Sequence, residues 1–353
     1  MEYAFSFKRY RLPLRTPLRT AHGLWTEREG LIVRLEDEAG RVGYGEIAPI
    51  PWFGTETVAE AEEVCRKFGD RVTEATLDQI PAKLGAVRFA LAAAKAEVER
   101  GLRTRFQEKS EGKTRPEAAF HQPKLRVPLT ALLPAGKPAL AALPPLLEAG
   151  WLTFKWKVGV GELGEEIGLL DELCAALPSY AKLRLDANGA WTRRQAEKWL
   201  ALWAARPVEF VEQPVGADDE SALHGLAEDF PVKLALDESV VQLDEVRRWQ
   251  AEGWAGVYVI KPALAGPLED VAAWVVANGA DVVLSSAIET ALGRAAILRF
   301  ALRHHSVLLQ RSPGFGIGEV FGDRQWDGPI LGPVLDESWF AAINSEELWN
   351  ALS

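Results

Sequence analysis

The stretch Thr153-Phe154-Lys155-Trp156-Lys157 decides the fold that we expect, because it reads as a short strand with two different faces. Successive side chains of a strand point to opposite sides, so Lys155 and Lys157 share one face while Phe154 and Trp156 share the other. A charged side chain is costly to bury without partners. The stretch therefore predicts a barrel strand whose lysines face an internal polar site and whose aromatic rings face surrounding helices.

Short apolar strands and amphipathic helices alternate around this stretch, from about Arg126 onward. Repeated strand–helix units with short connections are typical of a parallel sheet, and eight such units close into a barrel. The fold class that we predict is therefore α/β, a (β/α)8-type barrel. Its expected strands are Val127–Leu132, Thr153–Val158, Lys182–Asp186, Val208–Glu212, Val232–Asp237, Val257–Lys261, Val282–Ser285 and, as the eighth, Val307–Leu309.

The rest of the chain predicts a smaller N-terminal domain and a C-terminal tail. A chain of 353 residues is long for one hydrophobic core, which favours more than one unit. Strands and helices are expected at Tyr3–Leu14, Gly30–Glu38, Arg41–Ala48, Thr57–Phe68 and Val87–Leu102, and a linker or exposed loop at Arg105–Lys124. We expect an α+β capping domain with its linker over residues 1–125, the barrel over 126–331, and a tail over 332–353 that packs back on the capping domain.

Composition limits the partners and the location. The formal net charge of −10 gives an acidic surface that repels phosphate backbones, so no nucleic-acid partner is expected. No apolar run reaches transmembrane length, and residues 1–15 lack the apolar core of a signal peptide, so we expect a cytoplasmic location and no membrane partner. Cys65 and Cys174 are expected to be free thiols rather than a disulfide. Composition leaves the oligomeric state undecided.

Acidic side chains stand at the ends of successive predicted strands. Asp186, Glu212, Asp237, Lys261 and Ser285 follow one another at intervals of 24 to 26 residues, about one strand–helix unit each. Any one carboxylate could cap the following helix, but three carboxylates in register repel one another unless a cation holds them. All-oxygen ligands favour Mg²⁺, with Mn²⁺ as a substitute. The spacing therefore predicts a metal site at the barrel mouth.

The lysines predict the chemistry of this site. Two adjacent ammonium groups beside a divalent ion lower each other's pKa, which makes Lys157 a usable base near neutral pH. Lys261 comes four units later and is expected on the opposite side of the ring. Removing a proton next to a carboxylate builds a second negative charge on that carboxylate, which a metal ion stabilises. The site therefore predicts an enzyme that abstracts such a proton from a small-molecule carboxylate.

The same residues carry a resemblance. In order and spacing, they resemble the enolase superfamily and, within it, the muconate-lactonizing-enzyme subgroup, over nearly the whole chain. Four phrases are most similar to the subgroup's dehydratases of menaquinone biosynthesis: Gly43–Pro49 (GYGEIAP), Thr153–Lys157 (TFKWK), Leu185–Trp191 (LDANGAW) and Ser285–Thr290 (SSAIET). The resemblance implies syn dehydration of 2-succinyl-6-hydroxy-2,4-cyclohexadiene-1-carboxylate to an aromatic product.

The resemblance also implies roles for individual residues. Lys157 would be the base and then the acid that helps hydroxide leave, Lys261 would stabilise the intermediate from the other face, and Lys155 would tune Lys157 and hold a carboxylate oxygen. The Mg²⁺ ligands would be Asp186, Glu212 and Asp237, with Asn188 and Glu238 around them.

Substrate contacts are expected from the strand ends and from the capping domain. Ser285 and Ser286 are expected to open a helix, either as a capping box of Ser286 with Glu289 or as a site for the succinyl carboxylate, and the two are compatible. Gly314 and Gly316 indicate close backbone approach to the site rather than a dinucleotide motif. The loops Thr20–Gly23 and Pro51–Gly54 are expected over the mouth, where His22 is either a substrate contact or structural.

Two alternatives stay open. A racemase or epimerase, for example of N-succinylamino acids, would use Lys157 and Lys261 as bases on opposite faces. Dipeptide epimerases of the subgroup usually carry an Asp-x-Asp pair after the last strand, which Ser312–Gly318 lacks. A non-catalytic barrel that only binds a metabolite would not need the complete set of lysines and carboxylates.

Overall fold

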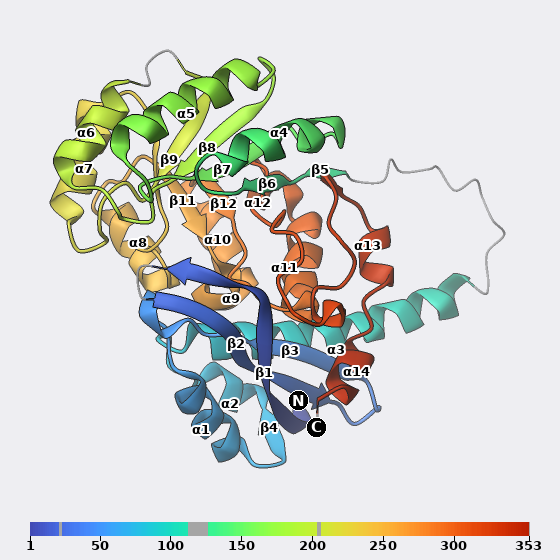
Figure 1. Cartoon of the computed structure of the whole chain (residues 1–353). Coiled ribbons are helices and arrows are strands. Elements are labelled where there is room, and N and C mark those ends of the chain that lie inside the picture. The colour runs from blue at the N-terminus through green and yellow to red at the C-terminus, as the bar shows by residue number, and fades with distance from the viewer. Residues whose placement is uncertain (21–22, 112–125, 203–205, 353) are drawn as a thin grey trace.

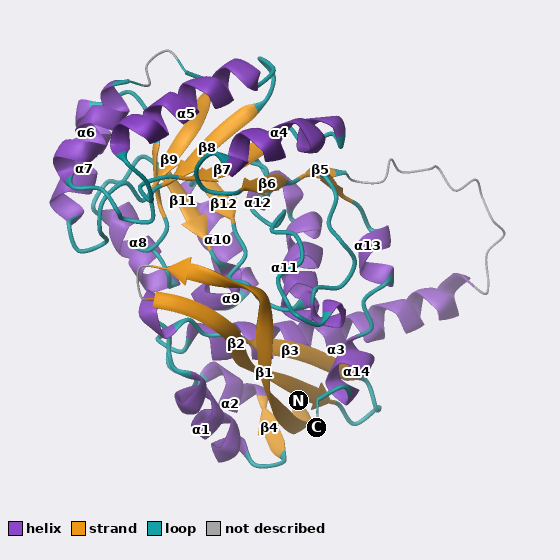
Figure 2. Cartoon of the chain, viewed as in Figure 1, coloured by secondary structure: helices purple, strands orange, loops and turns teal. Residues whose placement is uncertain are grey.

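The computed structural model describes residues 1–20, 23–111, 126–202 and 206–352. The chain forms an antiparallel sheet with its own helices and a parallel sheet curled into a barrel, with the barrel helices outside it (Figures 1 and 2). The α/β-barrel fold with an N-terminal α+β capping unit is therefore confirmed. None of the helices in the described part of the chain is long and apolar enough to cross a membrane.

The parallel sheet positions the functional side chains. Within the described residues it has seven strands in the order β12-β11-β10-β9-β8-β7-β6, and each overlaps a predicted strand. They are β6 (Thr130–Leu133), β7 (Thr153–Lys157), β8 (Lys182–Asp186), β9 (Val208–Glu212), β10 (Leu234–Leu236), β11 (Val257–Ile260) and β12 (Val282–Leu284). The helices around them are α4 (Pro138–Glu148), α5 (Leu163–Ala176), α6 (Arg193–Ala201), α7 (Glu220–Asp229), α8 (Leu243–Ala251), α9 (Pro262–Ala265), α10 (Leu268–Asn278), α11 (Ala291–Arg303) and α12 (His305–Leu308).

The eighth position of the barrel differs from the prediction. The expected strand Val307–Leu309 is wrong, because His305–Leu308 forms α12. Residues 313–316 close the ring instead: the Gly314 amide donates to the Leu284 carbonyl at 2.8 Å and the Gly316 amide to the Thr130 carbonyl at 3.1 Å. A short apolar run does not distinguish a strand from a helix, and a segment with a proline and two glycines lacks the strand signal.

The capping sheet has the strand order β3-β2-β1-β4. Its elements are β1 (Glu2–Thr20), β2 (Gly23–Glu36), β3 (Val42–Ile47), η1 (Pro51–Phe53), α1 (Val58–Phe68), β4 (Arg71–Thr73), α2 (Glu74–Asp78) and α3 (Gly85–Glu111). The predicted β2–β3 hairpin is confirmed, but β2 begins seven residues earlier than predicted. The α3 helix continues to Glu111, into the stretch expected as a linker, and residues 112–125 lie outside the described residues.

The C-terminal tail contacts both units. Its β13 (Val334–Leu335) pairs with β5 (Val127–Pro128) beside the barrel, and its helices are α13 (Ser338–Ala341) and α14 (Ser345–Asn350). The short helix η2 (Arg324–Trp326) precedes the tail. The Lys8 ammonium in β1 donates to the carbonyls of Trp349 at 3.2 Å and Leu352 at 2.6 Å. The domain boundaries that we placed at residues 125 and 331 stay predictions.

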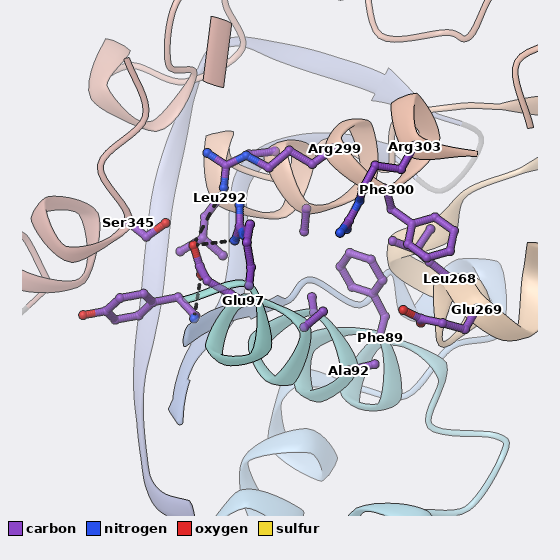
Figure 3. Close-up of a pocket in the computed structure, with 16 residues that line it drawn as sticks. Phe89, Ala92, Glu97, Leu268, Glu269, Leu292, Arg299, Phe300, Arg303 and Ser345 are labelled. Carbon is purple, nitrogen blue, oxygen red and sulfur yellow. Dashed lines mark hydrogen bonds and ion pairs between the residues drawn. The ribbon is translucent and has the colours of Figure 1, made fainter. Parts of the chain in front are cut away.

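A cleft between α3 and α11 marks another part of the contact between the two units (Figure 3). Glu97 accepts a hydrogen bond from the Tyr44 amide at 2.9 Å and pairs with Arg100 at 3.1 Å and Arg299 at 3.8 Å. None of the lysines expected to be catalytic lines this cleft. The pair between Glu97 of α3 and Arg299 of α11 joins the capping helix to the barrel.

Ion pairs close the barrel at the N-terminal ends of its strands. Glu209 accepts hydrogen bonds from Arg184 and Arg311, each at 2.6 Å. Asp281 accepts from Arg311 at 2.5 and 2.7 Å and from Lys233 at 2.8 Å. Above this network, apolar side chains fill the interior: Phe210, Ala235, Val257, Val259 and Val283. The barrel is therefore a packed core, and its polar site lies at the opposite end.

We expect Asp281→Asn to lower stability at neutral pH but not in strong acid. Burial alone would raise the pKa of Asp281, but hydrogen bonds from Arg311 and Lys233 outweigh it and bring the pKa to about 2, below the ordinary 3.8. The carboxylate therefore stabilises the fold above pH 3.8, and this contribution is lost as the pH falls towards 2. Because the side chain is partly exposed, the loss at pH 7 should be about 1 kcal/mol. Urea unfolding of both proteins across this pH range measures it; a difference as large at pH 2 as at pH 7 would contradict the assignment.

Candidate active site

A pocket lies at the C-terminal ends of the barrel strands. Its barrel residues are Thr130, Leu132, Lys155, Lys157, Asp186, Asn188, Asp237, Glu238, Lys261, Ser285, Ser286, Ile288, Gly314 and Ile317. The capping domain adds Leu18, Thr20, Trp25, Ile50, Trp52 and Phe53. The structure therefore brings most of the predicted site residues together in one cavity between the two units.

Strand β7 supplies the lysine pair. Lys155 and Lys157 line the pocket, while Phe154 and Trp156 are fully buried on the opposite face, as the alternation along a strand requires. The Lys155 ammonium lies 2.7 Å from Asp186 Oδ2 and 2.6 Å from Glu212 Oε1. Lys155 thus bridges the ends of the next two strands.

Lys261 approaches the pocket from the other side of the ring. It follows β11, which lies four strands from β7 in the sheet order. Its ammonium pairs with Asp237 Oδ1 and lies 4.7 Å from the centre of the Phe53 ring. An ammonium group over an aromatic face is a favourable cation–π contact. Phe53 therefore links the capping domain directly to one of the two lysines expected to act on the substrate.

The three carboxylates stand at neighbouring strand ends. Asp186 and Glu212 are register partners in β8 and β9, and Asp237 directly follows β10. Gln213, directly after Glu212, ties the end of β9 to the residues after β10: its side-chain oxygen accepts from the Asp237 amide at 3.0 Å, and its amide nitrogen donates to Ser239 Oγ at 2.8 Å. We do not predict this role from the sequence, although an amide residue directly after an expected ligand, Glu212, is a sequence signal for it.

The charges of the site act strongly on one another. Burial alone would raise the pKa of Asp186, but the Lys155 charge outweighs it and lowers the pKa. Burial and the charge of Asp186 raise the pKa of Glu212 well above its usual value. Burial would lower the pKa of Lys155, but Asp186 and Glu212 raise it instead. Adjacent ammonium groups are expected to lower each other's pKa, but in the structure the two carboxylates that Lys155 contacts have the larger effect and raise it.

The side-chain oxygens around the carboxylates are of the kind that binds Mg²⁺. Asn188 donates to Glu238 at 3.0 Å, and the remaining side-chain oxygens, Asn188 Oδ1 and Glu238 Oε2, are buried without a hydrogen-bond partner. Within the described residues, no three acidic, histidine or cysteine side chains are arranged to hold a metal ion as they stand. The site provides the oxygen ligands that Mg²⁺ prefers. The ammonium groups of Lys155 and Lys261 contact the same oxygens, so they would compete with the metal ion for them.

Only some of the predicted substrate-binding residues line the pocket. Ser285, Ser286 and Gly314 line the pocket. Gly316 does not, because it packs on the barrel wall: a Cβ added there would lie 2.3 Å from the Thr130 carbonyl and 2.6 Å from the Trp151 ring. His22 lies outside the described residues.

The helix after β12 corrects another expectation. Helix α11 begins at Ala291 with Thr290 as its N-cap, not at Ser285 or Ser286. Ser286 does donate to Glu289 at 2.9 Å, but this contact precedes the helix. Glu46 of the capping domain accepts from the amides of Thr290 and Gly293, each at 3.0 Å. The N-terminus of α11 thus binds a carboxylate of the protein itself, and the expectation that the two serines open this helix is wrong. Their contact with the succinyl carboxylate stays a prediction.

Apolar side chains form much of the pocket wall; the loop Pro51–Gly54 lies there as predicted, with Trp52 and Phe53, but the other apolar residues were not predicted from the sequence. Trp25 and Trp52 meet edge to face with ring centres 4.9 Å apart, and Ile50, Ile288 and Ile317 line the same cavity. Such residues carry no titratable group and follow no strand-end spacing. We had expected β2 to begin at Gly30, which left Trp25 outside the strand that brings it to the pocket.

Fold and site together define a class of protein, the capped α/β-barrel enzymes that take a proton from beside a carboxylate. Comparison with known proteins agrees. Residues 140–325 match the family described as enolase C-terminal domain-like, and residues 4–98 match the MenC N-terminal domain. The chain belongs to the o-succinylbenzoate synthase family of the enolase superfamily.

Individual relatives support this membership over nearly the whole chain. An o-succinylbenzoate synthase of Thermosynechococcus vestitus is 41% identical over 91% of this chain and 93% of that protein. An o-succinylbenzoate synthase of Edwardsiella ictaluri is 34% identical over 83% of this chain and 84% of that protein. The crystal structure of o-succinylbenzoate synthase from Thermosynechococcus elongatus, described as complexed with Mg in the active site, superposes with a TM-score of 0.80 at 35% identity over 99% of this chain and 100% of that one. An L-Ala-D/L-Glu epimerase of Bacillus subtilis shares the fold with a TM-score of 0.73 at 23% identity.

We expect Asp237→Asn to abolish Mg²⁺ binding and activity without unfolding the protein. The substitution keeps the size of the side chain but removes one charge from the predicted ligand set. Loss of a residue that only supports a ligand lowers metal affinity by about 10- to 100-fold. Loss of a ligand itself should therefore lower the Mg²⁺ affinity by at least about 100-fold. Calorimetric titration with Mg²⁺ and thermal unfolding measure the two effects, and the exposed Asp218→Asn is the matched control. Unchanged Mg²⁺ affinity in Asp237→Asn would remove this residue from the ligand set.

Proposed function

We propose that this enzyme is a Mg²⁺-dependent carbon–oxygen lyase that dehydrates 2-succinyl-6-hydroxy-2,4-cyclohexadiene-1-carboxylate to o-succinylbenzoate, a step of menaquinone biosynthesis. The observation that carries the proposal is one cavity that contains Lys157 and Lys261 from opposite sides of the ring and two of the three strand-end carboxylates, with Glu212 buried beside Lys155. The family membership and the similarity to o-succinylbenzoate synthases along the whole chain support it.

Each lysine has a distinct part in the proposed reaction. Lys157 accepts the proton from the carbon beside the ring carboxylate, and its ammonium form then returns that proton to the departing hydroxide, so that water leaves from the same face. Lys261 stabilises the negative charge from the opposite face, and the Phe53 ring keeps its ammonium in place. Lys155 holds a carboxylate oxygen of the substrate.

The metal ligands proposed from the sequence are Asp186, Glu212 and Asp237, with Asn188 and Glu238 beside them. When bound, Mg²⁺ supplies the positive charge that stabilises the second negative charge developing on the substrate carboxylate. The apolar wall of Trp25, Trp52 and Ile288 excludes water from the ring of the substrate. We also propose a cytoplasmic location, and Ser285, Ser286 and Gly314 as contacts of the succinyl arm.

A direct assay tests the function. We expect the purified protein to convert the cyclohexadiene carboxylate to its aromatic product in the presence of Mg²⁺, to lose this activity in EDTA, and to recover it when Mg²⁺ is restored in excess. Ultraviolet absorbance follows the aromatic ring as it forms. N-succinylamino acids, with chiral analysis, are the comparison substrates. Rapid racemisation of these compounds without aromatic product would replace the dehydratase assignment by a racemase.

We expect Lys157→Gln to lower kcat by about 10³-fold or more, because general-base catalysis alone contributes about 10² to 10⁴ and the same group also returns the proton. Mg²⁺ affinity should stay near that of the wild type, since Lys157 has no predicted role as a ligand. The exposed helix residue Lys198→Gln serves as the control, with steady-state kinetics and calorimetry as the measurements. Full turnover by Lys157→Gln would rule out this lysine as the base.

A further inference from the structure

Arg28 is a buried cation whose hydrogen bonds all go to backbone carbonyls. It lies in β2 with a relative exposure of 2%. Its guanidinium donates to Ile288 at 3.0 Å, Pro49 at 2.7 Å, Ala287 at 3.3 Å, Glu29 at 3.3 Å and, in a very short contact, to Ala48. A guanidinium has five N–H groups, so these contacts use its full donor capacity. An arginine that donates hydrogen bonds to five carbonyls fixes the path of the backbone around it.

Four of these carbonyls belong to two segments that form pocket walls. Ala48 and Pro49 lead directly into Ile50, Trp52 and Phe53 of the capping domain, all of which line the pocket. The other segment, Ala287–Ile288, follows the two serines at the end of β12 and belongs to the barrel. Arg28 thus connects a wall from each unit through one side chain.

The barrel segment is held by a second buried group from the same sheet. Glu46 of β3 accepts from the amides of Thr290 and Gly293, and Tyr10 donates to the same carboxylate at 2.7 Å. Arg28 therefore binds carbonyls at 287 and 288, and Glu46 binds amides at 290 and 293. The cation and the anion of the capping sheet bind complementary groups of one barrel segment.

The backbone at Ile288 needs such support. Its φ is +59°, a left-handed conformation that is unfavourable for a β-branched residue and persists only when neighbouring contacts enforce it. Arg28 binds its carbonyl, and Ser286 Oγ accepts from its amide at 3.0 Å. The Arg28 guanidinium also lies 5.3 Å from the centre of the Trp25 ring, which is another wall of the pocket.

We infer that Arg28 is a positioning residue for substrate binding: it holds the capping-domain wall at 48–53 and the barrel wall at 287–288 in the relative position that encloses the substrate. The inference rests on the proposed function for its kinetic readout. The lysines and carboxylates of the site stand on barrel strands that Arg28 does not contact, and Lys261, beside the Phe53 ring, is also held by its ion pair with Asp237. Its loss therefore affects the affinity of the pocket more than the chemical step.

The test is Arg28→Met, which keeps much of the side-chain volume but none of the donors. We expect KM for the cyclohexadiene carboxylate and Kd for o-succinylbenzoate to rise together, by about tenfold or more, while kcat changes by less than about threefold. Arg28→Lys, with three donors, should fall between this variant and the wild type. If Arg28→Met does not fold, Arg28→Lys carries the same test with a smaller expected rise.

The matched control is Asp37→Asn in the turn after the same strand. Asp37 accepts from the amides of Ala39 and Arg41, each at 3.0 Å, and does not line the pocket. Its substitution should lower the melting temperature but leave KM unchanged. The inference is overturned if the folded Arg28 variants only lose stability in the same way, or lose kcat at unchanged KM.

Hydrogen exchange separates this inference from the proposed function. Arg28→Met should speed amide exchange in the peptide over residues 284–293, whereas Asp37→Asn should not, and neither result depends on turnover. A wild-type protein without dehydratase activity would refute the proposed function alone. Unchanged exchange in Arg28→Met would refute the positioning role alone.

Discussion

The main constraint on the active site is the mutual repulsion of three carboxylates, which the barrel brings together at one end. Asp186, Glu212 and Asp237 lie at neighbouring strand ends because parallel strands of similar length finish at the same level. Such a group is stable only with cations among it. Lys155 and Lys261 already contact these oxygens, and Mg²⁺ is the divalent ion that suits them. Charge balance therefore links the metal binding proposed for these carboxylates and the placement of Lys155 and Lys261 in one constraint.

The rest of the barrel is stabilised independently of these charges. At the opposite end, Arg184, Glu209, Arg311 and Asp281 form ion pairs of their own, and apolar side chains fill the space between the two polar layers. The fold is thus stabilised by groups that take no part in the chemistry. The site can carry costly buried charges because the packed interior beneath it does not depend on them.

The capping domain completes the pocket through contacts at its boundary with the barrel. Glu46 occupies the N-terminus of α11, Arg28 holds the loop before that helix, and Phe53 lies against the Lys261 ammonium. Buried polar groups of this kind are favourable only when fully paired, so they permit one arrangement of the two units. The apolar wall around the substrate follows from that arrangement.

The sequence by itself determined the barrel class and the order of Lys155, Lys157, Asp186, Glu212, Asp237 and Lys261, because strand alternation and a regular unit length fix which residues reach the barrel mouth. It did not determine the eighth barrel segment, since residues 313–316 lack a strand pattern and close the ring through backbone hydrogen bonds. Nor did it reveal the contacts of Arg28, Glu46 or Gln213, each of which binds backbone groups of a distant segment. Only the tertiary structure decided those contacts, because backbone amides and carbonyls are the same at every position and become specific only when folding brings them within reach of a side chain.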